Sequence, residues 1–125
     1  MQPKAPSAIP AIRVVMHPQD TNPQGTIFGG VILSRIDQAA WIEAVRQAPR
    51  RYVTVAMTKV EFKQPVYTGD VLSLWAKTVK IGRTSITVHV DVRAARPMKA
   101  MDDIAVTAAE VVMVALDEAG KPTPI

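Results

Sequence analysis

The chain contains no cysteine among its 125 residues. This absence excludes a disulfide framework, a cysteine-based metal site and a cysteine nucleophile. Only two histidines are present, His17 and His89, and their spacing does not suit metal ligation, so we predict no metal site. Serine and threonine residues are scattered and never form the G-x-S-x-G pattern of a serine hydrolase. Any chemistry in this chain therefore depends on other groups, carboxylates and backbone amides among them.

Long apolar runs are also missing. No stretch approaches the roughly 18 apolar residues that a membrane span requires. The first ten residues are rich in proline and lack the apolar segment of a signal peptide. We therefore expect a cytoplasmic protein that does not associate with membranes.

Aromatic residues are few, at 5%, and the net charge is +4. The basic residues gather at 46–51, 77–83 and 93–99, and such clusters suit a polyanion. Nucleic acid is not favoured as a partner, because neither a basic helix nor a stacking-strand pattern is present. A phosphorylated small molecule fits as well, and an ordinary solvated surface explains each cluster taken singly.

The order of elements indicates one domain. We expect a flexible tail over residues 1–9 and a single domain over 10–125. Residues 84–95 alternate strictly between apolar and polar, which predicts a strand with one face in the core. The predicted order is a strand at 10–17, a loop at 20–30, a helix at 30–47, and then a meander of four strands at 52–63, 71–80, 84–95 and 104–117. This is an α+β fold in which a curved antiparallel sheet of about five strands wraps one long buried helix.

The predicted helix is apolar on almost every side, from Val31 to Val45. A helix of this kind is buried rather than lying on a surface. A sheet of five strands wraps only part of it, so we expect a second copy to cover the rest and the protein to form at least a homodimer.

The segment His17–Gly30 carries the strongest functional signal. It is rich in Pro, Asn, Asp and Gly, and ends in the pair Gly29–Gly30 directly before the helix. Amide N–H groups at a helix start have no partner within the helix, and glycine lets a ligand approach the backbone closely. A carboxylate, Asp37, follows on the helix. This arrangement is suited to chemistry on a carbonyl group.

Each candidate residue also has a structural interpretation. Asp37 lies among apolar helix neighbours, where a carboxylate has either a catalytic role or an ion pair with a facing Arg or Lys. Asn22 can donate to a carbonyl or orient water, or it can simply form an Asx turn. His17 is a possible acid–base group or a loop brace. The turn Gly82–Ser85 suits a phosphate or a pantetheine-like chain, or is an ordinary hairpin turn.

Taken together, the chain resembles the hotdog-fold acyl-CoA thioesterases of the acyl-CoA hydrolase family. The resemblance covers roughly residues 12–123. It is carried by the motif from Asp20 to Gly30, by Asp37 seven residues beyond it, and by further matching segments, which are 53–56, Val60–Asp70, Gly82–Ser85, 112–117 and 120–121.

The resemblance implies hydrolysis of acyl-CoA to a free acid and CoA, without a cofactor beyond the CoA of the substrate. It places Asp37 as general base or nucleophile, and Asn22 from the other protomer as a group that positions water or the thioester. The amides of Gly29 and Gly30 would polarise the thioester oxygen. The predicted site comprises Asp37, Asn22 and Gly30 as catalytic residues, with substrate-binding residues Gly29, Thr54, Val55, Ala56, Gly82, Arg83, Thr84 and Ser85.

The resemblance also implies dimers that assemble further into tetramers or hexamers. Two alternatives remain open at the level of sequence. One is a hotdog hydratase or dehydratase that uses His17, and the other is a non-catalytic acyl-CoA or lipid-binding module in which Asp37 is only ion-paired.

Overall fold

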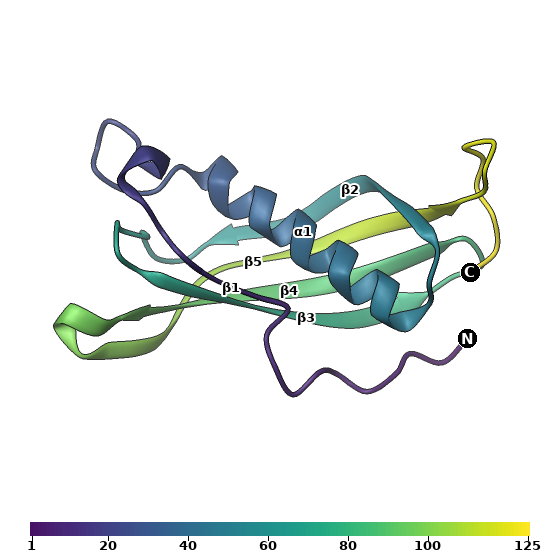
Figure 1. The fold of residues 1–125 in the computed structure, drawn as a ribbon, viewed down its shortest axis with the longest axis horizontal. Helices are drawn as coiled ribbons and strands as arrows, with labels where there is room; N and C mark the ends of the chain where they lie inside the picture. Colours follow the sequence, from purple (N-terminus) through teal and green to yellow (C-terminus); the bar gives the residue numbers. More distant parts are fainter.

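The computed structural model describes residues 1–125 and consists of one helix packed against one sheet (Figure 1). The five strands form a single antiparallel sheet in the order β1-β3-β4-β5-β2, and α1 lies across one of its faces. This arrangement confirms the predicted fold class. The elements are β1 (Ile12–Val15), the single-turn η1 (Pro18–Asp20), α1 (Gly29–Gln47), β2 (Arg51–Phe62), β3 (Val71–Ile81), β4 (Ser85–Arg96), the single-turn η2 (Pro97–Lys99) and β5 (Met101–Leu116).

The predicted four-strand meander is wrong in one respect. β3, β4 and β5 do follow one another across the sheet, but β2 pairs with β5 at the far edge rather than with β3. The amides of Lys63 and Gln64 extend this pairing by donating to the carbonyl of Val106. Alternating polarity fixes which face of a strand is buried and does not specify its neighbour. Here α1 crosses the sheet and delivers the chain to the free edge of β5.

The core lies between α1 and the inner face of the sheet. Alternate residues of β4, from Ile86 to Ala94, are fully buried, while the residues between them face outward. They meet the helix stripe that contains Ile32, Ile36 and Ala40. The apolar residues that recur every second position in the strand and every 3.6 positions in the helix therefore form one core.

One flank of α1 remains open, as predicted from its all-round hydrophobicity. The side chains of Trp41 and Ile42 are 48% and 39% exposed. On β2, whose outer edge has no partner strand, Val53 and Val55 are also exposed. An unpaired strand edge next to exposed apolar side chains is a surface suited to association. None of the helices combines the length and the hydrophobicity that crossing a membrane would take.

A buried carboxylate, Glu43, fixes the C-terminal half of α1. It is 2% exposed and accepts hydrogen bonds from Arg46 Nε (2.7 Å), Gln47 Nε2 (2.9 Å) and Thr78 Oγ1 of β3 (2.7 Å). Burial alone would raise the pKa of Glu43, but the hydrogen bonds from Arg46, Gln47 and Thr78 outweigh it and hold the pKa below its usual value. Glu43 therefore remains a charged anchor between α1 and the sheet.

The N-terminal tail is hydrogen-bonded to the same end of α1. The backbone amide of Lys4 donates to Gln47 Oε1 at 2.7 Å, and Arg46 donates to the carbonyl of Ala5 at 2.9 Å. The side chains that bind Glu43 thus also hold residues 4–5.

Candidate active site

The first turn of α1 presents free amide donors. The residue before the helix is Phe28, whose side chain cannot cap, and the N–H groups of Gly29 and Gly30 donate to no acceptor within the chain. The first intrahelical partner appears at Val31, whose amide donates to the carbonyl of Phe28. Most helices place Ser, Thr, Asp or Asn at this position to satisfy such donors. Leaving them open creates a site for a negatively charged oxygen.

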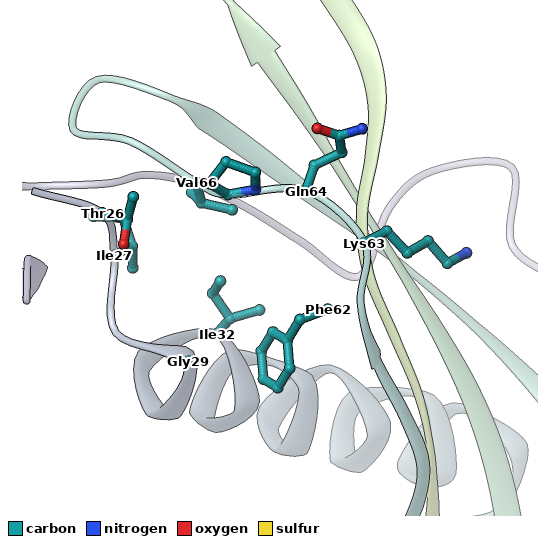
Figure 2. A pocket seen from close by; sticks show the side chains of 9 residues that line it. Thr26, Ile27, Gly29, Ile32, Phe62, Lys63, Gln64 and Val66 are labelled. Atoms are coloured by element: carbon teal, nitrogen blue, oxygen red, sulfur yellow. The ribbon is translucent and has the colours of Figure 1, made fainter. Parts of the chain in front are cut away.

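The two glycines differ in their surroundings. A Cβ atom on Gly29 would lie 3.0 Å from Cζ of Phe62, the last residue of β2, whereas Gly30 has open space around it. Figure 2 shows the Phe62 ring turned toward Gly29 at the edge of a hollow. The absence of a side chain at Gly29 therefore lets Phe62 pack closely against the helix start. Sequence reasoning did not include Phe62 in the site, although its place two residues after the Val60 of the family motif was visible.

The loop before the helix is braced by its own polar side chains. Asn22 Oδ1 accepts from the amides of Gln24 (2.9 Å) and Thr26 (3.2 Å), and Asn22 Nδ2 donates to Thr26 Oγ1 at 2.8 Å. Asp20 accepts from the amide of His17. In the single chain Asn22 therefore makes the Asx-type contacts, with one N–H of its amide group left to donate elsewhere.

Asp37 lies midway along α1 and faces β2. Its Oδ1 accepts a hydrogen bond from Thr54 Oγ1 at 2.5 Å. No Lys or Arg forms an ion pair with it, so the structural alternative raised by the sequence is not realised in this chain. The carboxylate lines a hollow of about 720 Å³ together with apolar side chains that include Trp41, Tyr52 and Met113. Asp37 is thus held in place by Thr54 and has no cationic partner.

The predicted segment 54–56 divides at an irregularity in the β2–β5 pairing. Thr54 faces α1 and bonds Asp37, Val55 lies at the irregularity and is exposed, and Ala56 pairs with Val112. Thr54 therefore joins the site by holding the carboxylate. Tyr52 lies two residues before Thr54 on β2. Its hydroxyl donates to the carbonyl of Ala48, and burial raises the pKa of Tyr52.

The predicted turn 82–85 lies at the opposite end of the molecule from the glycine pair (Figure 1). Its backbone is tied to the C-terminal residues, since Ile125 N–H donates to the carbonyl of Arg83 and Ala115 N–H to that of Thr84. A Cβ atom on Gly82 would lie 2.8 Å from Ser85 Oγ, so a larger residue here would displace the Ser85 hydroxyl. The guanidinium of Arg83 is exposed and makes no ion pair.

In one chain, then, the predicted residues fall into three separate groups. Asp37 follows Gly30 by seven residues, which is about 10 Å along a helix at 1.5 Å per residue. That separation is too large for both groups to act on one carbonyl. His17 is exposed at the start of the loop and lines neither hollow. Within one chain, therefore, the glycine pair, Asp37 and the turn Gly82–Ser85 do not form one site.

Comparisons with known proteins identify the family of the chain. Residues 24–101 match the thioesterase superfamily. An uncharacterized acyl-CoA thioester hydrolase of Zymomonas mobilis is 40% identical over 99% of this chain and 83% of its own length. A hexameric hotdog-fold thioesterase of Campylobacter jejuni has a TM-score of 0.88 and 46% identity, covering 94% of this chain and 90% of the other.

A third relative was solved with ligands. The acyl-CoA hydrolase of Staphylococcus aureus, in complex with butyryl coenzyme A, coenzyme A and coenzyme A disulfide, has a TM-score of 0.82 and 34% identity, covering 90% of this chain and 68% of the other. Structures of its Asn-to-Ala and Asp-to-Ala variants are also known. The chain therefore belongs to the thioesterase superfamily, and its fold is the hotdog fold.

Proposed function

We propose that this protein hydrolyses acyl-CoA thioesters to a free carboxylic acid and CoA. The observation that carries the proposal is the combination of two uncapped amides at Gly29–Gly30 with an Asp37 carboxylate that has no cationic partner. The first group suits a developing oxyanion and the second a general base. Family membership and the hydrolase relatives support the same reaction.

In the proposed mechanism water attacks the thioester carbonyl carbon. Asp37, oriented by Thr54, accepts a proton from the water. The amides of Gly29 and Gly30 stabilise the oxyanion, a contribution of about 3 kcal/mol per donor in comparable sites. The intermediate then collapses, the C–S bond breaks, and the thiolate of CoA leaves and takes up the proton. In an alternative mechanism Asp37 attacks the thioester carbon directly and forms an anhydride, which water then hydrolyses. Neither route needs a cofactor.

A second copy of the chain completes the site. α1 is long enough that a two-fold axis near Leu33, roughly 6 Å along the helix from both Gly29 and Asp37, would place the glycines of one copy level with Asp37 of the other. The open flank of α1 and the unpaired edge of β2 are the surfaces on which a second copy would pack. We propose a homodimer with a shared site, assembled further into a tetramer or hexamer. The hexameric thioesterase of Campylobacter jejuni supports the higher assembly.

Asn22 enters the site from the same loop as the glycines. In the Staphylococcus aureus hydrolase, the asparagine and the aspartate that were substituted are fifteen residues apart, as are Asn22 and Asp37. This equal spacing supports a pair of roles in which Asn22 positions water or the thioester for Asp37 of the other copy.

The turn Gly82–Ser85 then contacts CoA. A two-fold rotation reverses the direction of the partner's helix, so it brings the turn end of one copy toward the loop end of the other. The exposed, unpaired Arg83 at this turn is suited to a phosphate of CoA. Val55 and Ala56, beside Thr54 on β2, complete the substrate-binding set.

The direct test is release of free thiol from acyl-CoA by the wild-type protein and by Asp37→Asn. We expect turnover in the wild type and less than a tenth of it in Asp37→Asn, which still accepts the bond from Thr54 but binds no proton at neutral pH. Asp102→Asn, at an exposed carboxylate far from Asp37, is the matched control and should retain activity. No thiol release by the wild type, together with hydration of an enoyl-CoA that is lost in His17→Ala, would favour the hydratase assignment. Binding of acyl-CoA without either reaction would favour a binding module.

A further inference from the structure

A second hollow adjoins the helix start on the side of Phe62 (Figure 2). It has a volume of about 310 Å³. Its inner walls are core side chains, since Ile27, Ile32 and Val66 are each at most 5% exposed. Phe62 is 54% exposed and is the one large apolar wall at the surface. The hollow is therefore open to the protein surface and has an apolar floor.

Three polar residues line this hollow: the hydroxyl of Thr26 accepts from Asn22 Nδ2, and Lys63 and Gln64 stand at the rim. Figure 2 shows the side chains of Lys63 and Gln64 directed away from the space between Phe62 and Ile32. Neither is placed to pair with a charged group deep in the hollow. A polar or charged ligand would lose its hydration there without replacement, whereas a hydrocarbon chain would gain from leaving water.

The position of the hollow relates it to the reacting group. Gly29 forms part of the hollow and also carries one of the free amides. A thioester whose oxygen accepts from these amides has two substituents, the acyl chain and the pantetheine sulfur. The pantetheine arm must return to solvent with its charged nucleotide, so it is not suited to ending on the apolar floor of the hollow. The acyl chain has no such requirement.

We infer that this hollow binds the acyl chain and that Phe62 sets the chain length that the protein accepts. The inference rests on the proposed thioesterase function. The volume is at the small end of the range for ligand pockets, about 300–1,000 Å³, which favours short acyl groups. Phe62 is the adjustable wall, because it ends β2 and packs on Gly29, whereas the other apolar walls support the core.

The test is the dependence of kcat/KM on acyl length, measured from acetyl-CoA to palmitoyl-CoA. Phe62→Ala should raise kcat/KM for medium and long chains at least tenfold relative to short ones, since a few methylene groups in an apolar pocket discriminate by that much or more. Phe62→Trp should move the preference toward shorter chains. Trp75→Ala, which removes a tryptophan from the outer face of the sheet, is the matched control and should leave the order of chain lengths unchanged.

Two results would overturn the inference. One is an unchanged order of chain lengths in a Phe62→Ala protein whose thermal unfolding transition shows that it is folded. The other is a shift of that order by Trp41→Ala, in the hollow beside Asp37, and not by Phe62→Ala. Binding of non-hydrolysable S-alkyl-CoA analogues separates this inference from the proposed reaction. If wild type releases no thiol but Phe62→Ala still alters the length dependence of binding, the hydrolase assignment fails and the acyl site stands.

Discussion

At the level of single residues, the contact between Thr54 and Asp37 ties β2 to the proposed base. A hydrogen bond to a charged group contributes about 1.5–3 kcal/mol. Thr54→Val keeps the shape of the side chain and removes the donor. We expect kcat for thiol release to fall roughly tenfold or more, because the carboxylate loses its orientation. Thr58→Val, on the same strand and exposed, should change kcat little. Equal kcat values in both variants would show that Thr54 does not position Asp37.

Glu43 governs the dependence of stability on pH at the acid end. Its pKa is depressed in the folded state, since Arg46, Gln47 and Thr78 donate to the charged form. A group with a depressed folded pKa contributes stability above its unfolded pKa, and this stability is lost as the pH falls through the folded pKa. The free energy of unfolding in urea should therefore drop more steeply below about pH 4.5 in wild type than in Glu43→Gln. Parallel pH profiles for the two proteins would contradict this role.

Asp37 could be recognised from the sequence as a candidate site residue, whereas Glu43 could not be recognised as a buried anchor. Asp37 stood out because it follows the glycine pair by two turns of helix and lies among apolar neighbours. Glu43 could not be recognised as buried, because its three donors come from the next turn of α1 and from β3. Thr54 was predicted as a substrate contact, and only the packing of β2 against α1 shows that its hydroxyl points at Asp37.

At the level of elements, α1 begins with two glycines, which are weak helix formers and whose free amides we propose to bind the oxyanion. Gly30→Ala should stabilise the protein by up to about 1 kcal/mol, because alanine favours the helix and the site is open. Gly29→Ala should gain less or destabilise, because the new Cβ meets the ring of Phe62 at 3.0 Å. Adding Phe62→Ala to Gly29→Ala should restore the gain. Thermal unfolding of these three variants and of the wild type tests this prediction, and equal effects at the two glycines would contradict the predicted packing.

The boundaries of the elements followed from the sequence more closely than their arrangement. The helix at 30–47 and the strands at 52–63, 71–80 and 84–95 agree with α1, β2, β3 and β4 to within about a residue. Periodicity and turn residues determine such bounds locally. The placement of β2 beside β5 depends on the path of α1 over the sheet, which no local pattern encodes.

At the level of the whole molecule, the groups that we propose to carry out hydrolysis are distributed along a single chain. The loop with Asn22 and the glycine pair lies at one end, Asp37 in the middle and Arg83 at the other end (Figure 1). The sequence motif predicts these residues but not the distances between them, because those distances depend on how α1 packs on the sheet. A shared site accounts for the separation and for the exposed flank of α1 together.

Subunit mixing tests this central claim most directly. Asn22→Ala and Asp37→Asn homo-oligomers should each be inactive in thiol release from acyl-CoA. After subunit exchange, a mixed dimer carries one site with both substitutions and one site with an intact Asn22 and an intact Asp37. We therefore predict that activity returns on mixing, to no more than half of the wild-type value per mixed dimer. No recovery, once exchange is verified by mass spectrometry of differently tagged subunits, would contradict a site built from two copies.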